Sequence, residues 1–460
     1  MMHIQEAAHA LNARWQGQDV LFTGVSTDSR TLHQGDLFVA LSGERFDGHR
    51  FVDAAQRQGA VAAMVKLEFD ETALATEFPL MRVSNTQLGL GQLAAYWRKR
   101  FTLPLVAVTG SNGKTTVKEM LAAILRKASR EKAQGAEGHS QRVLATLGNL
   151  NNEIGMPLML LRLRENHQYG VIEMGMNHAG EIAYLTQLAK PDVAVITNAS
   201  TAHIAGLGST EAIAQAKGEI FSGLDESGVA IINADDCYAP LWRELAGKRK
   251  IIEFGLDKKA PVTAEFETDV CGSTVRLHLP SGTQNVNLGV PGIHNVRNSL
   301  AAAAAAVALD VDGETIAAGL ESFEGVTGRL QRRRGLNQSV LIDDCYNANP
   351  ESVRAALSVL AEAAGTKILV LGDMGELGTA SGNLHRAIGE DARRFDLDKL
   401  FTIGKWSKYT SDAYGQGAQH FDDMETLLET LEHCLDADVT VLIKGSRFMQ
   451  MERIADRLAG

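Results

Sequence analysis

The stretch Val106-Ala107-Val108-Thr109-Gly110-Ser111-Asn112-Gly113-Lys114-Thr115-Thr116 decides the fold of the chain around it. Its apolar first part predicts a buried strand, and a short glycine-containing loop follows. After the loop, apolar side chains recur at helical spacing, at Val117, Met120, Leu121, Ile124 and Leu125. Strand, loop and helix N-terminus in this order form a phosphate site, because loop amides can hold phosphate oxygens. We therefore predict a nucleotide-binding α/β domain here.

The loop also departs from the general phosphate-loop pattern. In Gly-x-x-x-x-Gly-Lys-[Ser/Thr] the first glycine would stand at the position of Val108, whereas here Gly110 begins the loop. The Lys114 ammonium can neutralise phosphate charge, and the Thr115 hydroxyl can bind Mg²⁺. A Gly-Lys-Thr sequence that occurs by chance is the alternative, and the flanking strand and helix patterns favour a phosphate site over it.

Composition restricts the class of protein. The chain has 460 residues, which suits two to four domains, and its net charge of −11 argues against nucleic acid as a general partner. The N-terminus lacks the pattern of a signal peptide, and no apolar run is long enough to span a bilayer. The four cysteines form no close pairs, so neither a zinc site nor a disulfide framework is indicated. We expect a cytoplasmic protein that does not insert into membranes.

Three blocks follow one another along the chain, with expected boundaries at residues 1–84, 85–312 and 313–460. The first block contains short β-rich runs. The second and third each alternate strand and helix patterns, which predicts two domains with parallel sheets. Within the second block, residues 262–290 alternate like antiparallel strands. The junction around Gly325-Val326-Thr327-Gly328-Arg329 looks like a hinge, with an ordinary surface loop as the alternative.

Several polar residues at element ends are candidates for the site. Glu173 ends an apolar run and can bind Mg²⁺ beyond the carboxyl end of a strand, or it can merely cap a helix. His203 and Lys217, taken alone, are typical of a structural loop residue and a solvated lysine. Asn295 and Asn298 can contact an adenine edge, while capping of the alanine-rich helix is the alternative for Asn295.

The third block contributes two further loops. Asp343-Asp344-Cys345-Tyr346-Asn347-Ala348-Asn349-Pro350 ends a strand and begins a helix. Asp344 can bind a ribose hydroxyl there, or the segment can be a polar turn in which Asn349 caps the helix ahead of Pro350. Lys444-Gly445-Ser446-Arg447 also joins a strand to a helix and suits a carboxylate or a phosphate.

Together these motifs resemble those of the Mur ligase family over nearly the whole chain. The family-wide marks are the phosphate loop, Glu173, His203, Lys217, Gly292–Asn298, Gly328-Arg329 and Lys444–Arg447. Other segments resemble the family members that attach D-alanyl-D-alanine: Ser26–Arg30, Asp47-Gly48-His49-x-Phe51, Thr146–Asn152, Tyr346–Pro350 and Gly372–Gly378. Gly375 is a departure, since a larger residue is expected at that position.

The resemblance implies an α/β fold of three domains: a small UDP-binding domain, a central ATPase domain of the P-loop type and a C-terminal Rossmann-like domain. It implies that ATP phosphorylates the terminal carboxylate of a UDP-N-acetylmuramoyl-tripeptide. The amine of D-alanyl-D-alanine then attacks the acyl phosphate, which yields a peptidoglycan precursor. Phosphorylation gives a poor electrophile a leaving group, and the transfer needs charge neutralisation and positioning. A monomer that uses two Mg²⁺ ions is expected.

The resemblance also implies roles for individual residues. ATP would contact Gly110, Ser111, Asn112, Gly113, Lys114, Thr115, Thr116, Asn295, Asn298, Arg329 and Asp344. Thr115 and Glu173 would hold one Mg²⁺, and His203 with a carbamylated Lys217 would hold a second. Ser29, Arg30, Asp47, Gly48 and His49 would bind the uridine diphosphate, with Asn151 and Asn152 facing the muramoyl tripeptide. Lys444, Ser446 and Arg447 would approach the dipeptide or the phosphate. Catalysis would then depend on Lys114, Glu173, His203, Lys217 and Arg329.

Three other functions compete with this one. A sister ligase would add a diamino acid to a UDP-dipeptide, and a folylpolyglutamate-type ligase would use a folate. The segments Asn347–Pro350 and Asp373–Gly378 argue against the former, and the UDP-binding character of the first block argues against the latter. A nucleotide switch would hydrolyse ATP without any acceptor. The sequence does not indicate whether the third residue of the tripeptide is a meso-diamino acid or lysine.

Overall fold

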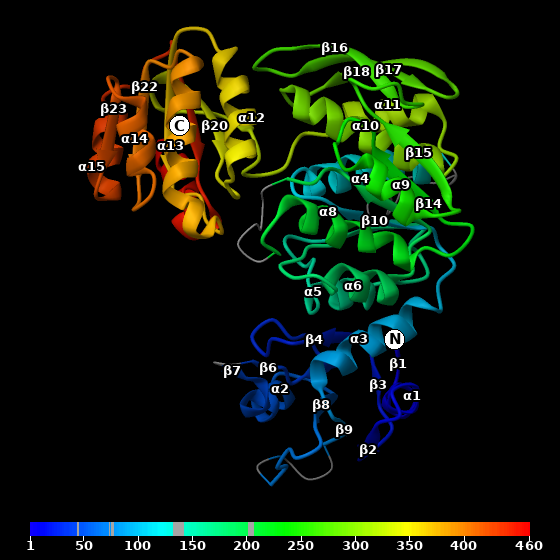
Figure 1. Ribbon diagram of the computed structural model, residues 1–460. Helices are drawn as coiled ribbons and strands as arrows, with labels where there is room; N and C mark the ends of the chain where they lie inside the picture. The colour runs from blue at the N-terminus through cyan, green and yellow to red at the C-terminus, as the bar shows by residue number, and fades with distance from the viewer. Residues whose placement is uncertain (44–45, 73, 75–77, 132–141, 201–206) are drawn as a thin grey trace.

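The computed structural model describes residues 1–43, 46–72, 74, 78–131, 142–200 and 207–460. Figure 1 shows three bodies of secondary structure that follow one another along the chain, from blue through green to red. Each contains a β-sheet with helices, so the predicted α/β fold of three domains is confirmed. Within the described ranges, no helix is both long and apolar enough to cross a membrane.

The N-terminal domain is built on a five-stranded sheet of order β2-β9-β8-β5-β4. Only β2 runs antiparallel to its neighbour. The strands are β2 (Arg14–Gln16), β4 (Gly24–Ser26), β5 (Asp36–Val39), β8 (Ala62–Lys66) and β9 (Leu80–Val83), and the pairs β1 (Met2–His3) with β3 (Leu21–Phe22) and β6 (Ser42–Gly43) with β7 (Phe46–Asp47) lie beside them. Helices α1 (Ile4–Ala10), η1 (Gly48–Phe51) and α2 (Val52–Arg57) complete this domain.

Helix α3 (Thr86–Arg98) connects the N-terminal and central domains. Its N-cap Asn85 accepts hydrogen bonds from the amides of Gln87 and Leu88, which satisfies the first turn. Leu90 and Leu93 on this helix are fully buried in one apolar cluster that takes residues from both domains. The first two domains therefore share a core around α3.

The central domain contains six parallel strands in the order β11-β12-β10-β13-β14-β15. Strand β10 lies where the order reverses, and ligands of open α/β sheets bind beyond the carboxyl end of such a position. The strands are β10 (Leu105–Thr109), β11 (Val143–Ala145), β12 (Tyr169–Glu173), β13 (Val193–Ile196), β14 (Val229–Asn233) and β15 (Lys250–Phe254). The helices are α4 (Lys114–Glu131), α5 (Gly155–Leu160), α6 (Glu181–Ala189), α8 (Thr210–Gly218), η3 (Glu219–Gly223) and α9 (Ala239–Ala246).

Helix α4 packs as its sequence period predicts. The five apolar residues at helical spacing after the phosphate loop are all fully buried. They pack in one cluster with the valines of β10 and with the alanine face of α10 (Ile293–Ala308). Burial of this apolar face holds the N-terminus of α4, and with it the phosphate loop, against the end of β10.

An antiparallel sheet of β16 (Thr263–Thr268), β17 (Ser273–Leu279) and β18 (Gly282–Leu288) covers α10, which confirms the alternation predicted for residues 262–290. Helix α11 (Gly313–Glu321) packs against α4 so closely that a Cβ on Gly319 would lie 2.4 Å from Cα of Ile124. Helix α11, which lies in the block expected to begin at residue 313, therefore packs with α4 of the central domain, and the boundary itself stays a prediction.

The C-terminal sheet has the order β19-β20-β24-β21-β22-β23. Strands β19 (Gln331–Arg334) and β20 (Val340–Asp344) are antiparallel, so the expected fully parallel sheet is in fact mixed. The remaining strands, β21 (Thr366–Gly372), β22 (Lys399–Ile403), β23 (Ala418–Phe421) and β24 (Val439–Lys444), are parallel to β20. The order brings the carboxyl ends of β20, β24 and β21 together.

The helices of this domain are η4 (Leu336–Gln338), α12 (Pro350–Ala361), η5 (Gly378–Ala380), α13 (Ser381–Arg394), α14 (Lys408–Tyr414), α15 (Met424–Glu432), η6 (Arg447–Met449) and α16 (Glu452–Leu458). The sequence period predicts an unbroken last helix over residues 448–458. Instead, Gln450 adopts a positive φ of 50°, which separates η6 from α16. This break leaves Phe448 on a short turn that follows β24.

Candidate active site

A cleft of about 1090 Å³ lies between the central and C-terminal domains. The phosphate loop, the ends of β12, β13 and β14, and the start of α10 line its central side. The loops after β20, β21 and β24 line the opposite side. This cleft is lined by most of the residues predicted for ATP: the loop residues from Ser111 to Thr116, and Asn295, Asn298, Arg329 and Asp344.

The phosphate loop is held by the chain segment that follows β13. Ser111 N donates to Asn198 O at 2.9 Å, and Asn112 N donates to Asn198 Oδ1 at 2.9 Å. Gly113 has a φ of 82°, and a Cβ there would lie 2.3 Å from Asn298 Oδ1, so both conformation and space require glycine. Contacts of this kind keep the loop in place for an anion.

Lys114 lies over its own loop. Its Nζ donates to the carbonyls of Gly110 at 2.8 Å and Ser111 at 3.3 Å, and burial lowers its pKa below that of an exposed lysine. The charge of Glu173 is the largest effect that opposes this fall in pKa. The lysine ammonium therefore lies against the phosphate loop, and its contact with phosphate oxygens stays a prediction.

Thr115 and Glu173 form a pair of oxygen donors at the base of the cleft. The Thr115 hydroxyl donates to Glu173 Oε2 at 2.8 Å, and Asn151 Nδ2 donates to Oε1 at 2.8 Å. Glu173 is 2% exposed and is the last residue of β12, so it does not cap a helix. A buried hydroxyl and carboxylate beside a phosphate loop fit a hard cation such as Mg²⁺.

The second predicted metal site is described only in part. Lys217 on α8 is 1% exposed, so it is not the solvated lysine that its sequence context alone suggests. Burial, with the charge of Lys114, holds the pKa of Lys217 well below its usual range. His203 lies outside the described residues. Within them, no group of three or more His, Cys, Asp or Glu side chains is placed to hold a metal ion.

Arg329 links the two walls of the cleft. Its Nη2 donates to Thr115 Oγ1 at 2.9 Å, and its guanidinium lies 4.2 Å from the centroid of the Tyr346 ring. Its Nε is buried and has no hydrogen-bond partner among the described parts of the chain. A guanidinium with a spare donor, held beside a phosphate loop, suits a phosphate oxygen.

Asn295 and Asn298 face the cleft from the first turns of α10. Asn295 does not cap the helix, because Gly292 is the N-cap; its amide instead donates to Pro291 O at 2.8 Å. Asn298 Nδ2 donates to Asn295 Oδ1 at 3.2 Å. Both side chains are buried at the cleft wall, so their remaining amide groups can reach a base edge.

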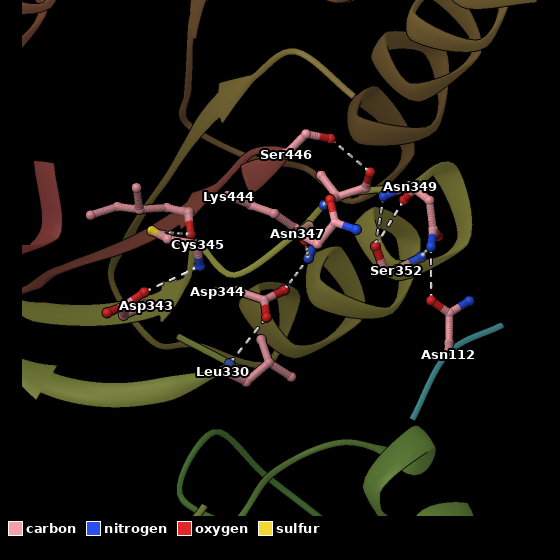
Figure 2. Close-up of polar contacts among 12 residues, drawn as sticks. Asn112, Leu330, Asp343, Asp344, Cys345, Asn347, Asn349, Ser352, Lys444 and Ser446 are labelled. Carbon is pink, nitrogen blue, oxygen red and sulfur yellow. Dashed lines mark hydrogen bonds and ion pairs between the residues drawn. The ribbon is translucent and has the colours of Figure 1, made fainter. Parts of the chain in front are cut away.

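Asp344 and Lys444, for which the sequence predicts different ligands, contact each other (Figure 2). Lys444 Nζ donates to Asp344 Oδ2 at 2.5 Å and to Asn347 O at 2.8 Å. Both side chains are buried, and burial raises the pKa of Asp344 while the lysine opposes that rise. The two residues are therefore a buried ion pair at the adjacent ends of β20 and β24.

Asn349 ties this loop to the phosphate loop. It caps α12 ahead of Pro350, which the sequence offers as an alternative, and the capping box with Ser352 is complete. Its Nδ2 also donates to Asn112 Oδ1 at 2.8 Å, across the cleft (Figure 2). Ser446 Oγ donates to Ala348 O at 3.1 Å, which fixes the loop after β24 to the same segment.

The residues expected to bind uridine diphosphate lie on the N-terminal domain and do not line the cleft. Arg30 pairs with Asp28 at 2.7 Å and lowers the pKa of that carboxyl to about 2. His49 accepts from Lys66 N at 2.9 Å and contacts Asp47 at 2.7 Å. These bonds give the turn a fixed shape. Ser29 and Gly48 lie on the same two segments of the N-terminal domain. Asn152, which is predicted to face the peptide part of this substrate, lies instead in the cleft, where its side chain accepts from Gly155 N at 2.8 Å.

The cleft also contains residues that were not predicted individually from the sequence, among them Glu376 and Phe448. Phe448 is 65% exposed. A Cβ on Gly375 would lie 2.9 Å from Phe448 Cε1, so the glycine noted as a departure leaves room for this ring. Glu376 belongs to the recognised segment Gly372–Gly378, whereas Phe448 follows Arg447 and has no sequence signal of its own.

Comparisons with known proteins agree along the chain. The family models described as "Mur ligase family, catalytic domain", "Mur ligase middle domain" and "Mur ligase, glutamate ligase domain" match residues 21–98, 108–306 and 328–447. The UDP-N-acetylmuramoyl-tripeptide–D-alanyl-D-alanine ligase of Escherichia coli K12 is 41% identical over 99% of this chain and 98% of its own length. The ligase of the same name from Haemophilus influenzae is 39% identical, over 98% and 96%.

Solved structures extend the similarity to the fold. The crystal structure of MurF from Acinetobacter baumannii superimposes with a TM-score of 0.89 at 37% identity, covering 99% of this chain and 98% of that one. MurF ligase from Thermotoga maritima in complex with ADP gives 0.81 at 28% identity, covering 95% and 97%. The similarity spans every domain described above.

Proposed function

Because the chain belongs to the Mur ligase family, we propose that it is an ATP-dependent ligase that adds D-alanyl-D-alanine to UDP-N-acetylmuramoyl-tripeptide. The product is the UDP-muramoyl-pentapeptide precursor of peptidoglycan. One observation carries this proposal: 41% identity to a ligase of that name extends over 99% of the chain, through all three domains. A nucleotide switch, the competing function, would not require first and third domains that resemble those of a ligase.

ATP fits the central side of the cleft. We assign the β- and γ-phosphates to the loop amides and Lys114, and adenine to Asn295 and Asn298. The spare Nε of Arg329 is the donor for the γ-phosphate. Asp344 is the expected ribose ligand; its pairing with Lys444 means that the ribose would contact this ion pair rather than a free carboxylate.

Mg²⁺ would be held by Thr115 and Glu173, whose oxygens already lie side by side. Bound there, it would neutralise charge on the phosphates. We assign a second ion to His203 and to a carbamylated Lys217. A buried amine that stays uncharged can add CO₂ to give a carboxylate-like ligand. Asn151, which donates to Glu173, holds that carboxylate in orientation.

The UDP moiety of the tripeptide substrate is assigned to Ser29, Arg30 and the Asp47-Gly48-His49 turn of the N-terminal domain. Asn152, beside Asn151, faces the peptide. Ser446 and Arg447, with Lys444, approach the dipeptide or the departing phosphate. The protein's part in phosphoryl transfer is then to align carboxylate and γ-phosphate and to exclude water from the acyl phosphate. We propose that it acts as a monomer in the cytoplasm, where ATP is available.

The test is phosphate release from ATP and Mg²⁺, with mass detection of the product. Release that requires both UDP-muramoyl-tripeptide and D-alanyl-D-alanine, with a pentapeptide mass, is expected. Release with a UDP-dipeptide and a diamino acid would identify the sister enzyme instead. Release that ignores every acceptor would identify a nucleotide switch, and alanine variants of Lys217 and His203 would then keep full activity.

A further inference from the structure

The loop that follows β21 is fixed to its surroundings on both sides of one residue. Asp373 Oδ1 accepts from the backbone amides of Trp406 and Ser407 at 2.9 and 2.7 Å. Gly375 N donates to Ser446 Oγ at 2.7 Å, and Leu377 is buried. Between these anchors, Glu376 is exposed and lines the cleft.

Glu376 also has an uncommon backbone conformation, with a φ of 62°. A glutamate is disfavoured in this left-handed region, so it persists there only where the surroundings impose the conformation. The anchored neighbours provide that constraint. The backbone that carries the Glu376 carboxylate is therefore held in a fixed position on the C-terminal wall of the cleft.

Glu376 lines the same cleft as the phosphate loop of the other domain. Ser446 Oγ accepts from Gly375 N, next to Glu376, and donates to Ala348 O, and the adjacent Asn349 donates across the cleft to Asn112 of the phosphate loop at 2.8 Å. Arg329, Lys444 and Arg447 are cations that line this cleft. Glu376 therefore lies near the place where the phosphate loop would hold the transferred phosphoryl group.

The ligation step requires a proton to be removed at this place. That requirement rests on the proposed function, in which the nucleophile is the α-amine of a dipeptide. With a pKa of about 8, that amine is mostly an ammonium at neutral pH, and an ammonium has no lone pair for attack. A carboxylate can bind the ammonium and accept its proton if it lies beside the acyl phosphate.

Three other acids of the cleft, Glu173, Asp344 and Glu351, lie near the phosphate loop, and Glu351 is only partly exposed and accepts from Asn112 Nδ2 of that loop at 3.5 Å. Glu173 is buried and held by Thr115 and Asn151, as suits a metal ligand. Asp344 is buried in its pair with Lys444. Glu376 differs from these three because its side chain is exposed to the cleft, on the wall that also carries Ser446 and Arg447.

We propose that Glu376 is a catalytic residue that binds the α-ammonium of the incoming dipeptide and removes one proton from it. The freed lone pair forms the C–N bond at the acyl carbon, and the carbonyl pair moves to oxygen. When the tetrahedral intermediate collapses, the C–O bond to phosphate breaks and the carbonyl re-forms. The second nitrogen proton leaves with the inorganic phosphate, and Glu376 passes the first proton to water.

The test uses full-length Glu376→Gln, with Glu390→Gln at an exposed position of α13 as the matched control. Glutamine keeps the size of the side chain but cannot accept the proton. We expect the dipeptide-dependent rate to fall about a hundredfold or more at pH 7, with the KM for ATP unchanged. The deficit should narrow as the pH rises above about 8, because the dipeptide amine then loses its proton unaided.

Hydroxylamine provides the decisive second readout. It is largely uncharged at neutral pH and traps acyl phosphates as hydroxamates, so its attack needs no base. Hydroxamate formation from ATP and UDP-muramoyl-tripeptide should be the same in Glu376→Gln as in the wild type, which also shows that the variant is folded. An equal loss with hydroxylamine, or no loss with the dipeptide, would overturn the assignment.

Failure of the proposed function would look different. In that case the wild-type protein itself would form no pentapeptide from D-alanyl-D-alanine, whatever residue stands at position 376. A wild type that forms pentapeptide, with a Glu376→Gln variant of unchanged pH profile, would leave the ligase in place and remove only the role of Glu376.

Discussion

Replacement of Lys444 by methionine tests the buried ion pair on the C-terminal wall of the cleft. Methionine keeps most of the apolar stem but removes the ammonium that bonds to Asp344 Oδ2 and Asn347 O. Removal of one partner of a buried pair costs about 3–5 kcal/mol, because the other charge is left without compensation. Asp344 keeps a bond from Leu330 N at 3.2 Å, so we expect the lower end, about 3 kcal/mol.

The assay is amide hydrogen exchange of peptides that cover β20 and β24, since a three-domain chain has no single unfolding equilibrium. A loss of about 3 kcal/mol corresponds to roughly a hundredfold faster exchange in these strands. Lys408→Met, on an exposed lysine of the same domain, is the control and should leave exchange unchanged. The double variant with Asp344→Asn should recover most of the protection, because it removes the unpaired charge.

The pH dependence follows from the pKa of Asp344. Burial already raises this pKa, and loss of the lysine raises it further. The folded variant therefore binds a proton at a pH where the unfolded chain has lost it, so the deficit is full at about pH 8 and smaller at about pH 5. Exchange that is unchanged in Lys444→Met, or a deficit that is equal at both pH values, would refute the account of a buried pair.

Four further predictions concern the cleft. Arg329→Lys should lower kcat roughly a hundredfold or more with a smaller change in the KM for ATP, because lysine cannot reproduce the planar fork of donors; steady-state kinetics would show it. Glu173→Gln should raise the Mg²⁺ concentration for half-maximal activity about tenfold or more, measured by Mg²⁺ titration at saturating ATP, and an unchanged value would exclude Glu173 as a ligand. Burial lowers the pKa of His294 from 6.5 to about 4, so the folded state resists protonation and stability is lost as the pH falls between these values. The protection of α10 amides against hydrogen exchange should fall over that range, and His294→Gln should flatten this fall. Solution scattering should show compaction when a non-hydrolysable ATP analogue and UDP-tripeptide bind together, and an unchanged radius would contradict closure about the Arg329 junction.

Much of the fold is legible from local patterns. The five apolar residues after the phosphate loop predict the buried face of α4, and the alternation over residues 262–290 predicts the antiparallel sheet. The capping role of Asn349 is also predictable, because it depends only on neighbouring residues. Strand β19, which makes the C-terminal sheet mixed, could not be predicted from the sequence. Its residues are all polar, whereas strands are recognised by their apolar residues.

The site is predictable less completely. The phosphate loop and Glu173 carry their signals in short motifs at strand ends, and the structure brings them together. Lys217 behaves differently: an Ala-Lys-Gly-Glu segment on a helix is typical of a solvated lysine, and only the packing of α8 makes this one buried. No sequence pattern singles out Glu376 either, because the role proposed for it depends on its position across the cleft from the phosphate loop of another domain.

The sequence by itself determined the elements with local causes: the strand, loop and helix of the phosphate site, the apolar faces of the helices and the caps at their ends. Tertiary structure alone decided which strand ends became neighbours. Strand β24 inserts between β20 and β21, and this order places Lys444 against Asp344, from a distant part of the chain, and Ser446 beside Gly375. Periodicity and capping act over a few residues, whereas strand order is set by how whole layers bury their apolar faces against one another.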